Sequence, residues 1–149
     1  MAGKAAVIFY SGTGNTEAMA EAVAVGAKKA GAEVLLAPVA DVDAEDIGRN
    51  YDYILLGCSA WGVEVIEEAQ MKPFCRKLEN FLHEKRMGIF GSCGWSRGAW
   101  LNSWEGELHF AGAVFPARPV LAYGYPDEEA VKSCEELGEA VVREEKEEK

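Results

Sequence analysis

The sequence predicts an α/β domain with a mostly parallel sheet and helices on both faces. Short apolar runs alternate along the chain with segments whose apolar residues recur every three or four positions, which is the pattern of strands joined by right-handed helical crossovers. The first, third and fourth runs are nearly continuous in apolar residues, as in strands buried on both faces. The chain has 149 residues, 49% of them hydrophobic, which is enough for one domain with a sizeable core.

Each element of this prediction rests on a short segment of sequence. The five expected strands are AAVIFY (5–10), EVLLAPV (33–39), YDYILLGC (51–58), RMGIFGS (86–92) and FPARPVLAY (115–123). The first expected helix carries an apolar face that ends at Gly31, made of Met19, Ala22, Val23, Gly26, Ala27 and Ala30. A short second helix begins at Asp43. The later helices are marked by apolar stripes at Phe74, Leu78 and Phe81, at Leu101, Trp104 and Leu108, and at Val131, Cys134, Leu137 and Val141.

No internal repeat, long linker or low-complexity insert interrupts this alternation, so residues 1–149 are expected to form a single domain. From Pro126 to Lys149 there are ten Asp or Glu residues against four Lys or Arg. Residues 143–149 are therefore expected to be a charged, frayed helix end.

Composition excludes several classes of function. The net charge of −10 opposes nucleic-acid binding and favours basic protein partners. No apolar run approaches the roughly 20 residues of a membrane span, and the N-terminal segment does not resemble a signal peptide. The four cysteines are separated by 17, 18 and 41 positions, which fits neither a CxxC redox pair nor a zinc site. We expect a cytoplasmic protein with no membrane association, no bound metal and packed thiols.

In sheets of this kind a ligand binds beyond the carboxyl ends of the strands. The loop after the first strand is SGTGNT, with Gly12 and Gly14 among hydroxyl and amide side chains and a helix following directly, so it predicts an oxyanion site. A Walker loop is excluded because its Lys is absent, and the third glycine of a dinucleotide fingerprint is replaced by Glu17. A terminal phosphomonoester held by neutral donors fits better.

The loops after the third and fourth strands each place one Trp beside a Gly. Trp61 precedes Gly62, and Trp95 follows Gly94. Two such residues near a predicted phosphate site favour a flat aromatic ligand held between the two indole rings.

Three ordered motifs, SGTGNT, GCSAWG and GSCGW, resemble those of the flavodoxins over essentially the whole chain except the charged tail. The fifth strand, PVLAYG, has no insertion, which is typical of the short-chain group. The resemblance implies a flavodoxin-like three-layer α/β/α sandwich with a five-stranded parallel sheet of order 2-1-3-4-5. It also implies non-covalently bound FMN and one-electron transfer between redox enzymes through an acidic surface, by a monomer that is not itself an enzyme.

The same resemblance assigns the cofactor-binding residues. The phosphate is expected to bind Ser11, Gly12, Thr13, Gly14, Asn15 and Thr16. Trp61 and Trp95 are expected on opposite sides of the isoalloxazine ring, and Glu64 near its N3 atom. The residues expected around the edge of the ring are Ser59, Ala60, Ser92, Cys93 and Gly94. Gly62 is expected to be the residue whose peptide flips when the flavin N5 atom gains a proton.

An unneutralised phosphate makes further negative charge on the flavin costly and lowers its reduction potential. One unit charge about 8 Å away, at an effective dielectric of about 20, contributes about 2 kcal/mol, or about 90 mV for one electron. In the family, the position of Val63 is commonly acidic. The loop after Trp95, which here contains Ser96 and Arg97, commonly contains Gly and Asp. We therefore expect a hydroquinone couple less negative than the family's usual one. A β-branched residue at Val63 is expected to favour the flipped peptide used by the semiquinone.

Two other functions share this strand order. One alternative is a flavodoxin-like NAD(P)H-dependent FMN oxidoreductase acting on quinones or similar acceptors, which would need an extra pocket and usually an oligomer interface. The other is a receiver-type signalling domain. Its acidic cluster near the end of the first strand is missing, because Phe9 and Tyr10 stand there.

Overall fold

The computed structural model describes residues 3–10, 14–59, 69–93 and 99–143. Within these residues a five-stranded sheet has the order β2-β1-β3-β4-β5, and every neighbouring pair is parallel. The strands are β1 Lys4–Tyr10, β2 Glu33–Pro38, β3 Tyr53–Ser59, β4 Arg86–Cys93 and β5 Val120–Tyr123. This arrangement confirms the predicted strand order and direction.

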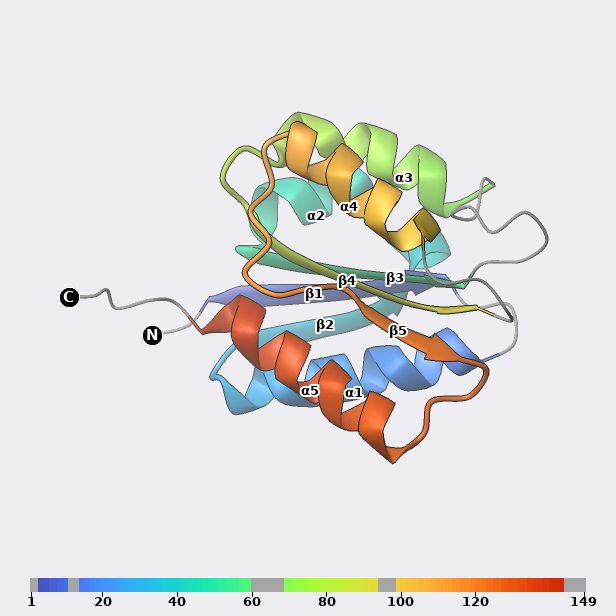
Figure 1. Ribbon diagram of the computed structural model, residues 1–149. Coiled ribbons are helices and arrows are strands. Elements are labelled where there is room, and N and C mark those ends of the chain that lie inside the picture. The colour runs from blue at the N-terminus through green and yellow to red at the C-terminus, as the bar shows by residue number, and fades with distance from the viewer. Residues whose placement is uncertain (1–2, 11–13, 60–68, 94–98, 144–149) are drawn as a thin grey trace.

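Helices cover both faces of the sheet, so the three-layer prediction is also confirmed. They are α1 Asn15–Lys29, α2 Ala44–Asn50, α3 Met71–Leu78, α4 Ala99–Phe110 and α5 Glu128–Val142, with 3-10 turns η1 Val39–Asp41 and η2 Glu79–Phe81. Figure 1 shows α1 and α5 on one face and α2, α3 and α4 on the other. The helix that follows β1 and the helices that follow β3 and β4 therefore leave the sheet on opposite faces.

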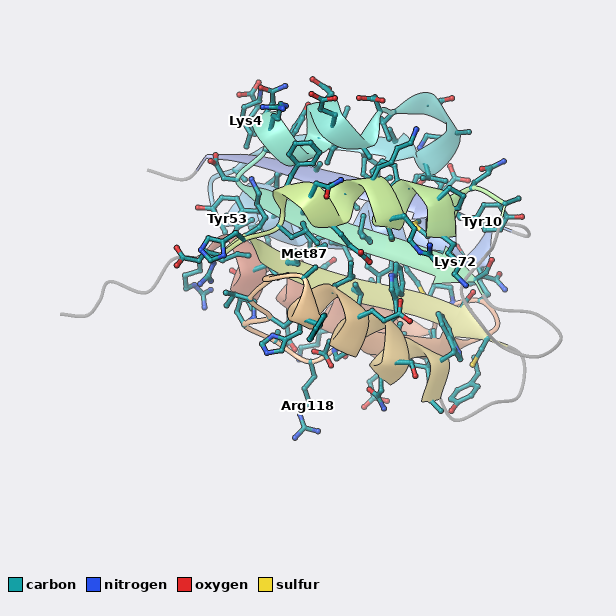
Figure 2. The ribbon with its side chains drawn as sticks, turned by 90° about the horizontal axis from the view of Figure 1, so that it is seen from above. Lys4, Tyr10, Tyr53, Lys72, Met87 and Arg118 are labelled. Atoms are coloured by element: carbon teal, nitrogen blue, oxygen red, sulfur yellow. The ribbon has the colours of Figure 1, made fainter. Side chains whose placement is uncertain are left out.

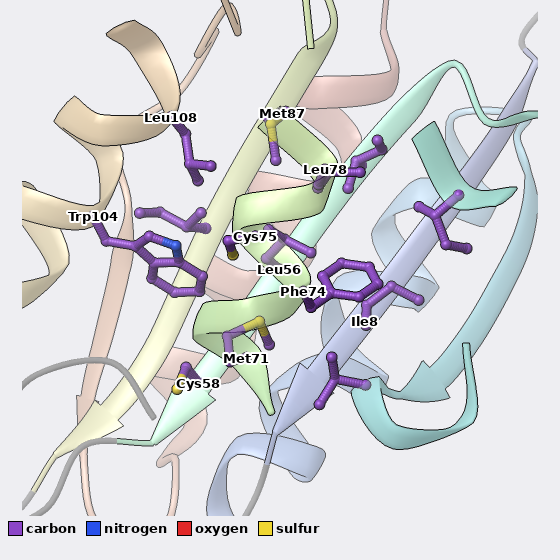
Figure 3. Close-up of a cluster of buried hydrophobic side chains, with 14 of the residues drawn as sticks. Ile8, Leu56, Cys58, Met71, Phe74, Cys75, Leu78, Met87, Trp104 and Leu108 are labelled. Atoms are coloured by element: carbon purple, nitrogen blue, oxygen red, sulfur yellow. The ribbon is translucent and has the colours of Figure 1, made fainter. Parts of the chain in front are cut away.

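Two hydrophobic cores lie on the two faces of the sheet, because alternate residues of each strand point in opposite directions. In β1, Ile8 belongs to the core under α2, α3 and α4, whereas Val7 belongs to the core under α1 and α5. Figure 3 shows the first of these cores, in which Trp104 of α4 lies over the strands near Cys75 of α3. Trp104 also stacks on Trp100, with ring centroids 6.5 Å apart. Both indoles are buried, so they are core residues.

Helices α1 and α5 pack closely because glycines stand where they meet. A Cβ atom on Gly26 of α1 would collide with the backbone carbonyl of Glu135, and one on Gly138 of α5 would collide with the carbonyl of Val23. The contact is reciprocal, since each helix supplies a glycine against the other's backbone. The close approach fixes where α1 lies relative to α5 on this face of the sheet.

Strand β5 begins later than predicted. The apolar run 115–123 suggested nine residues of strand, but β5 comprises Val120–Tyr123. Pro116 and Pro119 stand in the first part of the run, and proline has no N–H with which to continue a ladder of hydrogen bonds. Val114 instead forms an isolated bridge with Arg86.

The C-terminal helix ends near the predicted tail. Helix α5 ends at Val142, and the Arg86 guanidinium donates hydrogen bonds to the carbonyls of Ala140, Val141 and Arg143. A cation bonded to the last carbonyls of a helix is favourable because it opposes the negative end of the helix dipole. Residues 144–149, the rest of the predicted tail, lie outside the described part of the chain.

Candidate functional site

The carboxyl ends of the parallel strands define the candidate site. Because all five strands run in the same direction, Tyr10, Ser59, Cys93 and Tyr123 end strands at one edge of the sheet. Figure 2 shows Tyr10 at this end of the molecule and Lys4, which begins β1, at the other. Strand β1 has β2 on one side and β3 on the other, so the order of the strands reverses here, which is where α/β proteins of this kind bind ligands.

The structure describes part of the predicted set of site residues. Those described are Gly14, Asn15, Thr16, Ser59, Ser92 and Cys93, and all of them lie at or next to this edge. The predicted residues that lie outside the described part are Ser11, Gly12, Thr13, Ala60, Trp61, Gly62, Glu64, Gly94 and Trp95, together with Val63 and Arg97.

The beginning of α1 is built differently from the beginnings of α2 and α5. The Asp43 carboxylate accepts a hydrogen bond from Asp46 N at the start of α2, and the Asp127 carboxylate accepts one from Ala130 N at the start of α5. Helix α1 begins after Gly14, which has φ +93° and no side chain to act as a cap. An anion at this helix end therefore meets no capping carboxylate on the N-cap residue. The positive φ explains why this residue is glycine, since L-amino acids rarely adopt such a φ.

Basic side chains are absent from the sequence around this turn. No Lys or Arg occurs between Lys4, at the opposite end of β1, and Lys28, in the last turn of α1. A helix of 15 residues is about 20 Å long, so Lys28 lies far from Gly14. Helix α1 can offer an anion the positive end of its dipole and neutral donors, but no cation from its own first turns.

A buried hydrogen bond joins this helix to strand β4. Thr16 Oγ1 and Ser92 Oγ are 3.0 Å apart, and Thr16 is 0% exposed while Ser92 is 3% exposed. Both residues were predicted to bind cofactor, but their pairing was not predicted. They are 76 positions apart in sequence. A local sequence pattern cannot predict a contact between the first turn of α1 and the end of β4, because the two elements are not neighbours in the chain.

The thiols near the edge are packed rather than exposed. Cys58 and Cys93 are buried and not in disulfides, and Cys58 Sγ donates to the carbonyl of Ser59 at 3.3 Å. Ser59 itself is 3% exposed. The burial of both cysteines agrees with the prediction of packed thiols.

Two exposed tyrosines at the same edge were not assigned a role from the sequence. Tyr123 ends β5 and Tyr125 follows it, with 57% and 72% of their surfaces exposed. They line a hollow of about 330 Å³ together with Asp127 and Glu129 of the turn and first part of α5. The hollow combines aromatic and acidic surface beside the strand ends.

Other kinds of site receive no support from the described residues. Across residues 3–10, 14–59, 69–93 and 99–143, no three His, Cys, Asp or Glu side chains are placed to hold a metal ion. In the same ranges, no helix is long and apolar enough to cross a membrane.

Comparison with known proteins gives consistent matches. The family model described as Flavodoxin matches residues 7–138. The chain is 37% identical to a flavodoxin of Clostridium beijerinckii over 135 residues, covering 91% of this chain and 96% of that protein. It is also 37% identical to a flavodoxin of Megasphaera elsdenii, covering 92% of this chain and 97% of that one. The solution structure of two-electron reduced Megasphaera elsdenii flavodoxin superposes with a TM-score of 0.85 at 36% identity, covering 94% and 99% of the two chains.

Proposed function

The chain belongs to the flavodoxin family, and from this premise we infer that it binds FMN non-covalently and carries single electrons between redox enzymes. The observation that carries this inference is the match over nearly the whole length of both relatives, combined with a sheet of the order 2-1-3-4-5. The protein is an electron carrier rather than an enzyme. The alternative of an NAD(P)H-dependent oxidoreductase has less support, because two relatives that cover 91% and 92% of the chain are named flavodoxins.

The described residues fit the phosphate end of FMN. A phosphate dianion is a hydrogen-bond acceptor, and α1 begins at a glycine without the carboxylate cap that α2 and α5 carry. An acidic cap at this point would repel the phosphate, whereas a helix N-terminus whose N-cap residue carries no carboxylate attracts it. We propose that Gly14, Asn15 and Thr16 hold the phosphate together with Ser11, Gly12 and Thr13.

The ring of FMN belongs at the ends of β3 and β4. FMN supplies the redox chemistry, since its isoalloxazine ring takes up and releases the electrons. We propose that Trp61 and Trp95 flank the ring and that the chain around Ser59, Ala60, Ser92, Cys93 and Gly94 surrounds its edge, with Gly62 and Glu64 near its polar atoms. The buried Ser59, Ser92 and Cys93 would limit the access of water from the side of the sheet.

The electrostatics of the site support a low potential. The sequence supplies no Lys or Arg between residues 4 and 28, and the first turn of α1 carries Glu17. The phosphate charge is therefore not neutralised by this segment, and added negative charge on the flavin is unfavourable.

Titration of the apo-protein with FMN tests the cofactor assignment. We expect flavin fluorescence to be quenched until one FMN per chain is bound, and we expect the loaded protein to consume almost no NADH in the absence of a reductase. Sustained NADH oxidation by the purified protein would favour the oxidoreductase alternative instead.

We propose that redox partners dock on the acidic surface beside the strand ends. The net charge is −10, and the first turn of α5 carries Glu128 and Glu129 close to the exposed Tyr123 and Tyr125. Aromatic residues are common contact residues at protein interfaces, and the carboxylates would attract a basic partner and raise the rate of encounter.

A pair of charge reversals tests this docking surface. In E128K/E129K we expect slower electron transfer to cytochrome c, a basic haem protein, at low ionic strength. The matched control is E33K/E84K, which makes the same change in net charge at two exposed residues. Glu33 begins β2 and Glu84 lies just before β4, so both are at the opposite edge of the sheet. Equal slowing by both double variants would mean that net charge alone, and not this surface, sets the rate.

We also propose that the protein is a cytoplasmic monomer. All four cysteines are buried thiols and none of them is in a disulfide, as is usual for proteins in a reducing compartment. Sedimentation velocity should show a single species of about the chain mass of 16.2 kDa, and a dimer would contradict the proposal.

A further inference from the structure

The strongest unexplained feature near the site is the buried pair of hydroxyls. Thr16, Ser59 and Ser92 are the buried polar side chains among the described residues. Of these, Thr16 and Ser92 bond to each other across 3.0 Å. Thr16 lies in the first turn of α1, where the phosphate is proposed to bind, and Ser92 is the penultimate residue of β4, which leads toward the proposed ring site.

Counting the protons shows what the pair can do. A hydroxyl group has one proton to donate and two lone pairs that can accept. Either oxygen of this pair could be the donor, so the bond alone leaves two directions open. A phosphate dianion offers only acceptors. A Thr16 hydroxyl that binds phosphate must donate its single proton to it, and Thr16 Oγ1 is then the acceptor of the bond with Ser92.

We propose that Ser92 is a positioning residue, whose hydroxyl donates to Thr16 Oγ1 and thereby directs the Thr16 proton toward the phosphate of FMN. The inference rests on the proposed FMN site and deepens it, because it gives the Ser92 side chain a role through Thr16 rather than through direct contact with the flavin. Hydrogen bonds in such a chain polarise one another, so the bond from Ser92 strengthens the one that Thr16 makes to the anion.

The arrangement also suits a site without cations. Helix α1 has no Lys or Arg in its first turns, so the strength of each neutral donor matters more for holding the phosphate. A donor whose oxygen already accepts a hydrogen bond is a better donor than an isolated hydroxyl. Burial keeps water from competing for the Thr16–Ser92 bond.

The test compares FMN with riboflavin, which has the same ring but no phosphate. For each variant, flavin fluorescence titration of the apo-protein gives the ratio of riboflavin to FMN dissociation constants. We expect S92A to lower this ratio about threefold to tenfold, mainly through weaker FMN binding. T16V should lower it further, and T16V/S92A should match T16V, because Ser92 has no effect once the Thr16 hydroxyl is gone.

Conservative variants separate positioning from packing. S92T and T16S keep both hydroxyls and should keep the wild-type ratio. If S92A shows no cooperative urea transition or binds neither flavin, S92C replaces it, since a thiol is a weak donor and should give an intermediate ratio.

Three results would overturn the inference. The first is an S92A or S92C protein that loses affinity for FMN and for riboflavin by the same factor. The second is an S92C protein whose ratio of riboflavin to FMN dissociation constants equals that of the wild type. The third is a T16V/S92A protein in which the effects of the two single substitutions on this ratio multiply. Failure of the proposed function is distinct, because wild-type protein would then bind no FMN at all.

Discussion

The contact between α1 and α5 gives a stability prediction that the structure makes quantitative. Gly138 lies where α5 meets α1, and a Cβ atom at this position would overlap the carbonyl oxygen of Val23 and lie 2.9 Å from Ala27 N. Both groups belong to the backbone of α1, so they cannot rotate away as a flexible side chain could. G138A therefore requires the two helices to separate.

The expected size of the effect follows from two opposing contributions. Overpacking of a well-packed contact costs about 1–3 kcal/mol, and this contact sits at the upper end because backbone atoms are involved. Alanine is a better helix former than glycine by about 1 kcal/mol, which offsets part of that cost. We expect G138A to lose about 1–2 kcal/mol in the free energy of unfolding, equivalent to a few degrees in Tm.

Gly106 in α4 provides a matched control. It is also a glycine within a helix, but a Cβ atom there would meet no atom within 4 Å. G106A should therefore gain about 0.5–1 kcal/mol, because alanine restricts the unfolded chain and favours the helix. The assay is urea unfolding followed by far-UV circular dichroism. A G138A protein as stable as G106A, or more stable, would contradict a steric clash between α5 and the backbone of α1.

Three further predictions concern the buried thiols and the ring site. Burial raises the pKa of Cys75 and of Cys134 from 9.0 to about 12, so the folded protein keeps two protons that the unfolded chain releases above pH 9. The free energy of unfolding is therefore unaffected by these thiols below pH 9. As the pH rises toward 12, it falls by up to about 1.4 kcal/mol per pH unit for each thiol. In urea titrations between about pH 8 and about pH 10.5, C134A should show a shallower loss of stability than the wild type, and identical slopes would argue against the buried-thiol account. R97D, which adds negative charge near the proposed ring site, should lower the potential of the second reduction step by tens of millivolts; spectroelectrochemistry showing a rise or no change would remove that argument. V63G should reduce the maximum amount of one-electron-reduced flavin during stepwise reduction, because glycine accepts positive φ as readily as negative φ and so loses the preference expected of a β-branched residue. An undiminished maximum would count against this prediction.

Much of the fold could be predicted because it depends on local patterns. The apolar runs and helical stripes located the five strands and four of the five α-helices of the described residues. Asp43 marked the start of the remaining helix, α2, through an N-cap bond that depends on residues three apart. The late start of β5 was missed because the length of the apolar run outweighed Pro116 and Pro119. Their missing N–H groups decide where the ladder begins.

The kind of site stays a prediction from the sequence, whereas one of its connections is seen only in the structure. The glycine and hydroxyl pattern of the first loop predicts an anion site, and the positive φ of Gly14 explains why a glycine stands at that position. The bond between Thr16 and Ser92 could not be predicted, because it depends on how α1 crosses the sheet. The position of α1 relative to α5 on the sheet is set by the close contacts of Gly26 and Gly138 with the backbone of the facing helix. The periodicity of apolar residues in a helix does not predict these contacts.

The most direct test of the electron-carrier function is the visible spectrum of the FMN-loaded protein during stepwise reduction. We expect two separate one-electron steps, with a long-wavelength band that rises in the first step and disappears in the second. A colourless protein that does not bind added FMN, or a flavin that is reduced in a single two-electron step, would contradict it.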